Sequence, residues 1–86
     1  MNKVIIVSKC IKITQLNPFE KWHEFHFKGV CAGEALRKVL LKGNSSLSIV
    51  KGEEYLIYVQ VVSCKDGVLN GTILKVKALE SCWDKS

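Results

Sequence analysis

The sequence has few of the features that would mark a membrane protein or a secreted protein. Its apolar runs are short, and no segment approaches the roughly 18 apolar residues that a membrane-spanning helix requires. The apolar run of residues 4–7 ends at Ser8 and Lys9, so it is shorter than the apolar region of a signal peptide, and no small-residue cleavage site follows. We therefore expect a cytoplasmic protein that does not enter a membrane.

Patterned cysteines are also absent. The four cysteines stand at positions 10, 31, 64 and 82, with no CxxC pair and no other paired spacing. This arrangement matches neither a zinc ribbon nor a readable disulfide framework. We expect reduced thiols that pack as small hydrophobic side chains, with no bound metal.

Catalytic motifs are missing as well. The sequence contains no phosphate-binding loop, no nucleophile elbow and no cluster of carboxylates. Its densest polar stretch carries His23 and His26, but this spacing is not the His-Glu-x-x-His pair of a helical zinc site. On a strand the two histidines point to opposite faces, so they cannot share a metal without a bulge. We expect neither an enzyme nor a cofactor-binding protein.

What remains is the composition of one ordinary globular domain, residues 1–86. Hydrophobic residues make up 48% of the chain and charged residues 24%, which disfavours disorder. The formal net charge is +5, but the acidic residues are interspersed among the basic ones and no polybasic tail exists. The charge permits an anionic partner, and it equally fits a mixed, solvated surface.

The strongest structural signal is the Asp66-Gly67 pair between two long apolar runs. This dipeptide favours a two-residue type I′ turn, in which both central residues have positive φ. Pairing Lys65 with Val68 fixes the register of the hairpin and divides its side chains between two faces. The buried face is predicted to hold Ile57, Val59, Val61, Leu74 and Val76. The exposed face is predicted to hold Leu56, Tyr58, Val62, Leu69 and Ile73.

Strand signals divide the whole chain into five segments. β-branched residues fill the first segment, and its alternation breaks near residues 8–10, so we expect a bulge or a bend there. Pro18 separates this segment from the second, because proline cannot donate to a strand ladder. The predicted strands are 3–16, 22–31, 35–42, 53–64 and 68–79.

The second segment alternates between apolar and polar side chains. Phe25 and Phe27 share one parity and should face the core. Trp22, His26 and Lys28 share the other parity. These three side chains should form an aromatic and basic strip on the outside of the molecule.

Two short segments leave alternatives open. Residues 32–42 match a helical stripe and have good helix propensity, but they also fit a strand. A strand is favoured, because a helix there would leave too few strands to close a barrel. Residues 47–50 fit either one turn of helix or a half-strand that plugs one end of a barrel. Near the C-terminus, Trp83 is expected to fold back over exposed apolar surface.

This outline resembles the OB-fold, a five-stranded barrel with a bent first strand, a three-strand meander and a connector before a final hairpin. The Lys51-Gly52-Glu53-Glu54-Tyr55 entry into the fourth strand and the late Gly-x-Ile of the fifth strand are also similar to OB domains. The resemblance covers the whole chain but is architectural, and an SH3-like small barrel fits nearly as well. We predict a mainly β fold: a small five-stranded antiparallel OB-like barrel, with at most one short helix.

The resemblance implies a non-enzymatic binding module with single-stranded DNA or RNA as its leading ligand. Such binding uses aromatic platforms for the bases and a cationic groove for the phosphates. The candidate stacking groups are Trp22, His26 and Tyr58. The candidate phosphate contacts are Lys28, Arg37, Lys38, Lys75 and Lys77.

The competing hypothesis is a protein-interaction or assembly module, acting as a homodimer or as a subunit of a complex. The exposed hairpin face would offer an apolar patch larger than a monomer of this size usually leaves in water. Edge-strand pairing or a self-complementary sheet interface would bury that patch. Salt separates the two hypotheses, because phosphate binding weakens steeply as salt rises whereas apolar association does not.

Overall fold

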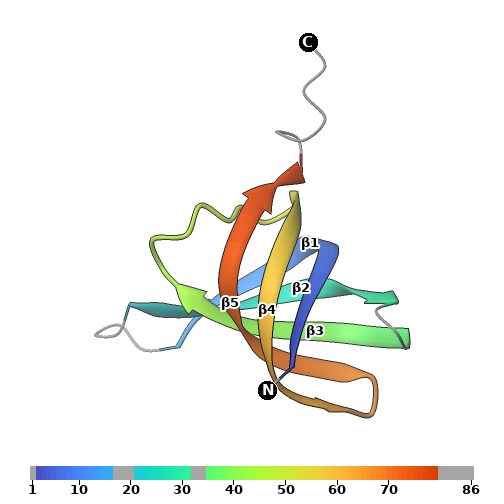
Figure 1. The fold of residues 1–86 in the computed structure, drawn as a ribbon. Coiled ribbons are helices and arrows are strands. Elements are labelled where there is room, and N and C mark those ends of the chain that lie inside the picture. Colours follow the sequence, from blue (N-terminus) through green and yellow to red (C-terminus); the bar gives the residue numbers. More distant parts are fainter. Residues whose placement is uncertain (1, 17–20, 32–34, 80–86) are drawn as a thin grey trace.

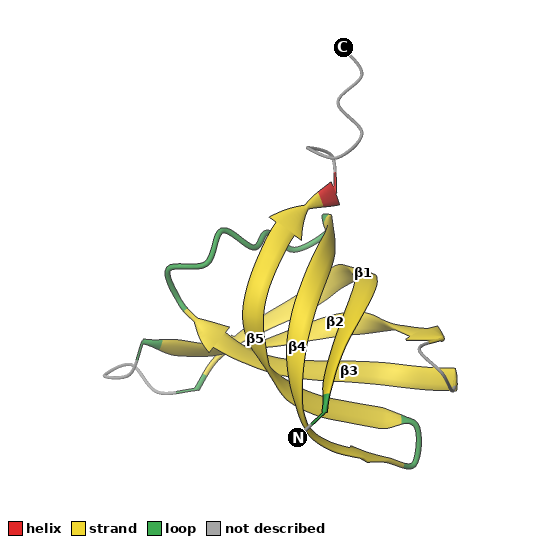
Figure 2. Cartoon of the chain, in the orientation of Figure 1, coloured by secondary structure: helices red, strands yellow, loops and turns green. Residues whose placement is uncertain are grey.

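Five β-strands close into a small barrel in the computed structural model, which describes residues 2–16, 21–31 and 35–79 (Figure 1). The strands are β1 (Lys3–Gln15), β2 (Trp22–Cys31), β3 (Ala35–Asn44), β4 (Glu54–Lys65) and β5 (Val68–Ala78). The predicted strands and mainly β fold are confirmed. Residues 32–42, which fitted either a helix or a strand, form a strand over their described part, residues 35–42. The connector of residues 45–53 contains neither a helix nor a strand (Figure 2).

The strand order around the barrel is β1-β2-β3-β5-β4, with β4 returning to pair with β1. This is an OB-like arrangement. Four of the neighbouring pairs are antiparallel, whereas β3 and β5 run parallel to each other. The predicted five-stranded OB-like barrel is confirmed, and the antiparallel description holds for every neighbouring pair except β3 and β5. The reason is geometric: an odd number of strands cannot alternate in direction all the way around a closed ring, so at least one pair must be parallel.

Strand β1 bends so that its two halves pair with different neighbours (Figure 1). Its first half pairs with β4 up to Lys9, and its second half pairs with β2 from Cys10 onward. A register shift between Cys10 and Lys12 marks a bulge just after the bend, close to where the sequence predicts one. Ser8 is buried at this point, and its Oγ donates a 2.6 Å hydrogen bond to the carbonyl oxygen of Lys28 on β2.

The β4–β5 turn has the predicted chemistry. Asp66 and Gly67 have φ values of 55° and 77°, as a type I′ turn requires. Lys65 pairs with Val68 next to the turn, and Tyr55 pairs with Ala78 at the far end, both in the predicted register. The turn chemistry alone therefore sets the two ends of this hairpin correctly.

The middle of the hairpin departs from the predicted register. Two register shifts, one between Tyr58 and Val59 and one between Val61 and Ser63, displace the pairing by one residue and then restore it. Each irregularity reverses which side chains point inward. As a result Leu74, predicted to be buried, is 51% exposed, whereas the core holds two residues predicted to be exposed, Leu69 and Ile73.

The rest of the core follows the sequence pattern. Phe25 and Phe27 are 1% and 0% exposed, so the prediction that they face inward is confirmed. The other fully buried side chains are Cys10, Val39, Leu41, Ile57 and Val59. Val61 and Val76, which were predicted to be buried, are partly buried and pack against this cluster.

The connector between β3 and β4 covers one part of the core without regular structure. Ile49 is buried in the hydrophobic cluster, as expected of a segment that plugs a barrel end. The backbone nitrogen of Val50 donates a 2.7 Å hydrogen bond to the hydroxyl of Tyr55, which fixes the connector to β4. The expectation that Trp83 folds back concerns a residue outside the described part of the chain. Within that part, no helix has the length and apolar content to cross a membrane.

Candidate functional site

An open groove runs across the outer surface where β2, β3 and the first half of β5 lie side by side. We call this surface the groove face. Its outward side chains come from β2 at even-numbered positions, from β3 at Lys38, Leu40 and Lys42, and from β5 at Asn70 and Thr72. β3 pairs with β5 here in parallel, with Leu40 beside Asn70 and Lys42 beside Thr72.

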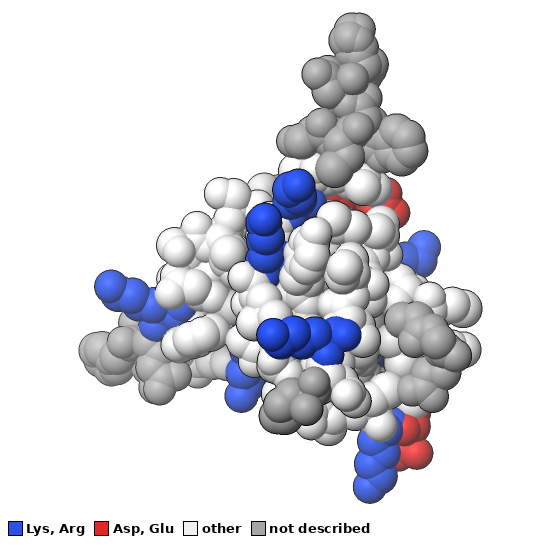
Figure 3. Space-filling view, viewed as in Figure 1, with Lys and Arg blue, Asp and Glu red and all other residues white. Residues whose placement is uncertain are grey.

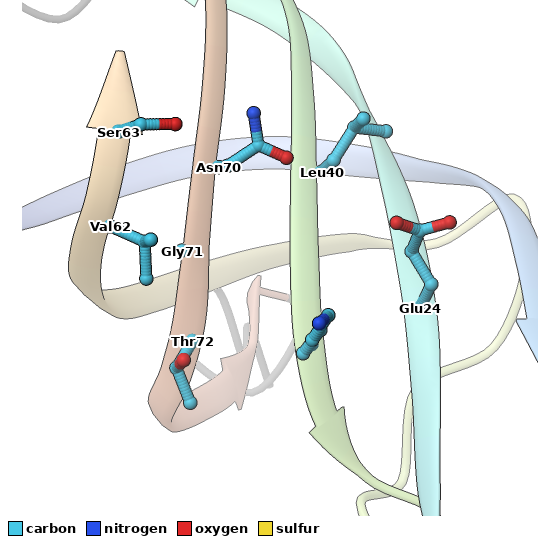
Figure 4. A pocket seen from close by; sticks show the side chains of 8 residues that line it. Glu24, Leu40, Val62, Ser63, Asn70, Gly71 and Thr72 are labelled. Carbon is cyan, nitrogen blue, oxygen red and sulfur yellow. The ribbon is translucent and has the colours of Figure 1, made fainter. Parts of the chain in front are cut away.

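The groove is visible in close-up in Figure 4. Leu40 and Lys42 stand on β3, with Glu24 on the neighbouring β2. On the other side the end of β4 contributes Val62 and Ser63. The walls therefore combine a lysine, a carboxylate, short polar groups and exposed aliphatic surface. This mixture suits a ligand that has both polar edges and apolar faces.

Trp22 extends the groove toward the start of β2. Its side chain is 43% exposed, and it lines a shallow hollow together with Leu16, Lys42 and Thr72. The two hollows share Lys42 and Thr72, so they lie next to each other. Trp22 thus presents a large ring to solvent beside a cationic side chain. A stacking platform for single-stranded nucleic acid requires this combination.

The far end of the groove face carries two lysines next to each other. Lys28 on β2 pairs directly with Lys38 on β3, and both side chains are exposed. Like charges directly opposite each other on neighbouring strands are destabilising, because their Cβ atoms stand only about 5 Å apart. An anion placed between the two ammonium groups would remove this repulsion. The pair is therefore a suitable contact for a phosphate.

His26 lies between these two ends, and the side chain of Glu24 contacts its imidazole ring. Its Nε2 lies 3.3 Å from Oε1 of Glu24, and the His26 side chain is 16% exposed. The contact covers part of the imidazole and places the Glu24 carboxylate beside a potential cation. His26 accordingly offers little ring surface for stacking.

The structure brings together four of the predicted site residues and separates the others. Trp22, His26, Lys28 and Lys38 all belong to the groove face. Arg37 instead lies beside the β4–β5 turn, where its Nε donates a 3.1 Å hydrogen bond to the carbonyl oxygen of Asp66. Tyr58, Lys75 and Lys77 lie on a different face, formed by β1, β4 and the second half of β5. There the Lys75 ammonium stands 5.8 Å from the centre of the Tyr58 ring.

Several groove residues were not among those predicted from the sequence. Lys42 could have been found from its parity, since it faces the same way as Lys38 on β3. Asn70 and Thr72 carried no such signal. They join the groove only because β5 runs parallel to β3, two strands that are far apart in the sequence and have no local turn between them.

The thiols and histidines form no reactive constellation within the part of the chain that the structure describes. Cys10 is 0% exposed, and burial raises the pKa of its thiol, which disfavours the reactive thiolate. Cys31 is exposed at the end of β2. No group of three or more potential metal ligands occurs among the described residues.

The fold and the groove define a class: a small OB-like closed barrel with an open depression on one outer face. Comparison of the chain with protein-family models, with curated proteins and with solved structures found no match.

Proposed function

We propose that this protein is a non-enzymatic module that binds single-stranded nucleic acid along the groove face. The observation that carries the proposal is the placement of the exposed Trp22 ring beside Lys42 at one end of the groove. An exposed tryptophan on an outer strand face costs solubility unless a ligand covers it. A nucleobase supplies a flat apolar surface of matching size, and its phosphate supplies the charge for the lysine.

The length of the face supports an extended ligand. Trp22 and Lys28 lie six positions apart on β2, which corresponds to roughly 20 Å of strand. The Lys28–Lys38 pair therefore meets the backbone several nucleotides away from a base stacked on Trp22. Between these two ends lie aliphatic Leu40, the Glu24 carboxylate and the short polar groups of Asn70 and Thr72. We expect little preference for base sequence, because stacking and phosphate contacts do not depend on base identity.

The direct test is a titration of the full chain with a labelled single-stranded oligonucleotide of about 12 nucleotides, within the range that one OB-fold contacts. Fluorescence anisotropy is measured at low and at moderate salt. We expect binding that weakens steeply with salt. No binding at low salt would overturn the proposal.

The sharpest variant is Trp22→Ala. We expect a loss of about 1–3 kcal/mol in binding free energy, because the stacking surface is removed. Thermal stability should change little, since the ring is 43% exposed in the folded protein. Tyr58→Ala is the matched control, because it removes an aromatic ring from a different face. If Trp22→Ala unfolds the domain, or if both variants weaken binding equally, the platform does not exist.

A further inference from the structure

A second surface, formed by strands β1, β4 and β5, is apolar at its centre. We call it the apolar face; it consists of Ile5, Val7, Leu56, Tyr58 and Leu74. Ile5 pairs with Tyr58, and Val7 pairs with Leu56, so aliphatic and aromatic side chains stand side by side across two strands. Ile5, Val7 and Leu74 are 58%, 42% and 51% exposed. Figure 3 views the molecule from the side on which these three strands lie in front.

The sequence of β1 is that of a strand covered on both sides. Val4 and Ile6 face the barrel interior, whereas Ile5 and Val7 face outward. Continuous apolar runs are typical of strands buried on both faces, and strands with one wet face usually alternate with polar residues. Within the described part of the chain nothing covers the outer side. The run therefore favours a further surface that covers the outer side of β1.

The bulge in β5 adds a third strand to this surface. Leu74 is the extra residue where the β4–β5 register shifts, and it points outward instead of into the core. Together with Lys3, Ile5 and Tyr58 it lines a shallow, mostly apolar hollow. Bulges re-aim individual side chains and recur next to functional surfaces.

The rim of the apolar face is basic. Its outward-facing charged residues are Lys3, Lys9, Glu54, Lys75 and Lys77. Glu54 stands opposite Lys9 across the two strands, and none of the four lysines has an ion pair to a described residue. In Figure 3 basic side chains border a largely uncharged area, and acidic atoms are visible only toward the edges.

This charge pattern selects among the possible occupants. A second copy of the chain would bring the lysines of one face against those of the other, which is unfavourable. A nucleic acid would gain phosphate contacts but would leave four aliphatic side chains without a stacking role. An acidic protein surface satisfies both the aliphatic centre and the lysine rim.

We propose that the apolar face is a docking surface for a partner protein whose contacting segment is aliphatic at its centre and carries carboxylates at its edges. The proposal does not depend on nucleic-acid binding, since the two faces share none of the residues that carry them. The aliphatic contacts supply affinity, and the lysines set the choice of partner and its orientation.

The experiment selects peptides from a random display library against the full chain and measures the affinity of the enriched peptides in solution. We expect the enriched sequences to combine Leu, Ile or Val with Asp or Glu. Leu74→Ser should weaken their binding about tenfold, as expected when a half-exposed leucine loses its contacts. An excess of unlabelled oligonucleotide should not compete with these peptides.

Three matched variants complete the design. Ile11→Ser changes a residue of similar exposure on β1 beyond the bend, and it should alter peptide affinity less than twofold. Ile5→Ser repeats the test at a second position of the apolar face if Leu74→Ser proves unstable in a thermal melt. The double variant Lys75→Gln/Lys77→Gln should weaken binding severalfold and reduce its dependence on salt.

Each of the other outcomes would overturn the proposal. Enriched peptides without an excess of Asp and Glu would contradict it. Equal affinity of the peptides for the Leu74→Ser variant and for the natural chain would contradict it too. Self-association in sedimentation velocity that Leu74→Ser abolishes would assign the face to a second copy. Binding to vesicles containing phosphatidylserine that the same substitution abolishes would assign it to a lipid surface.

Discussion

The Asp66-Gly67 turn depends on two residues that adopt a backbone conformation most side chains avoid. Asp66 has a φ of 55°, in the left-handed region that aspartate tolerates better than most residues. Gly67 has a φ of 77°, and a Cβ added there would lie 3.3 Å from Cγ of Arg37. The turn also serves β3, because the carbonyl oxygen of Gly67 accepts hydrogen bonds from the backbone nitrogens of Arg37 and Lys38. One dipeptide thus holds together β3, β4 and β5.

Replacing Gly67 should therefore cost stability in proportion to the strain of positive φ. We expect Gly67→Val to lower the free energy of unfolding by about 1 kcal/mol or more, because a β-branched residue is strained in this region. Gly67→Asn should cost less, since asparagine adopts positive φ more readily. Urea unfolding of both variants measures the difference. Equal losses would show that the contact with Arg37, and not the backbone conformation, sets the cost.

Burial in the barrel lowers the reactivity of the Cys10 thiol. This residue is 0% exposed, and burial raises the pKa of its thiol above the ordinary value. We expect iodoacetamide to modify the exposed Cys31 readily at pH 8 and to leave Cys10 unmodified until the protein is unfolded in urea. Mass mapping of the peptides distinguishes the two sites. Equal labelling rates in the folded protein would mean that the barrel opens near β1 on the labelling timescale.

The pKa of Cys10 also gives stability a pH dependence. The folded protein holds the proton more tightly than the unfolded chain, so the unfolded state loses it first as pH rises through 9.0. The contribution of the protonated thiol is fully present below this pH and declines above it. The Cys10→Ala variant should lack that decline, and comparing denaturant midpoints at pH 8 and pH 10 tests the assignment.

At the scale of elements, the strands were predictable because local signals define them. The alternation of β2 identified Phe25 and Phe27 as core residues, and the Asp-Gly turn set both ends of the last hairpin. The two compensating bulges were not predictable. Each depends on how β5 passes between β3 and β4, and no residue near Leu74 carries a local signal for it. A one-residue shift was enough to exchange Leu74 with Ile73 in the core.

Gly71 shows how tightly β5 is held between its neighbours. It pairs with Leu41 on β3 and with Val61 on β4, and a Cβ added there would lie 2.6 Å from the carbonyl oxygen of Gln60. We expect Gly71→Ala to destabilise by about 1–3 kcal/mol, since a backbone atom cannot move aside without shifting β4. Gly43→Ala is the control, because its added Cβ meets only the ends of side chains. A thermal shift of equal size in both variants would show that β4 adjusts easily.

The groove face was predictable only on one of its sides. Parity along β2 placed Trp22 and Lys28 on an outer surface, and the structure confirms that both side chains are exposed. The other wall needed the parallel pairing of β3 with β5, which joins segments separated by the whole connector and β4. The same topology separated Tyr58 and Lys75 from Trp22, although all three had been grouped as one site. A surface made by barrel closure is a property of the topology, and residue patterns alone do not reveal it.

At the scale of the whole molecule, lysines lie on two faces whose neutral surfaces differ. On the groove face the lysines accompany an exposed tryptophan and short polar groups. On the apolar face they surround exposed aliphatic side chains. A uniform positive charge attracts any anion at long range, and only the local surface decides which ligand stays bound. Removing lysines from one face at a time therefore distinguishes a local binding site from an effect of the total charge.

Two double variants remove the same charge from different faces. Lys28→Gln/Lys38→Gln acts on the groove face, and Lys75→Gln/Lys77→Gln acts on the apolar face. For oligonucleotide binding we expect the first variant to lower the slope of log affinity against log salt by roughly 1–2 units and the second to leave it nearly unchanged. The first should also keep or slightly raise stability, because it removes a like-charged cross-strand pair. Equal loss of slope in both variants would show that oligonucleotides respond to the net charge of the molecule and not to a site on the groove face.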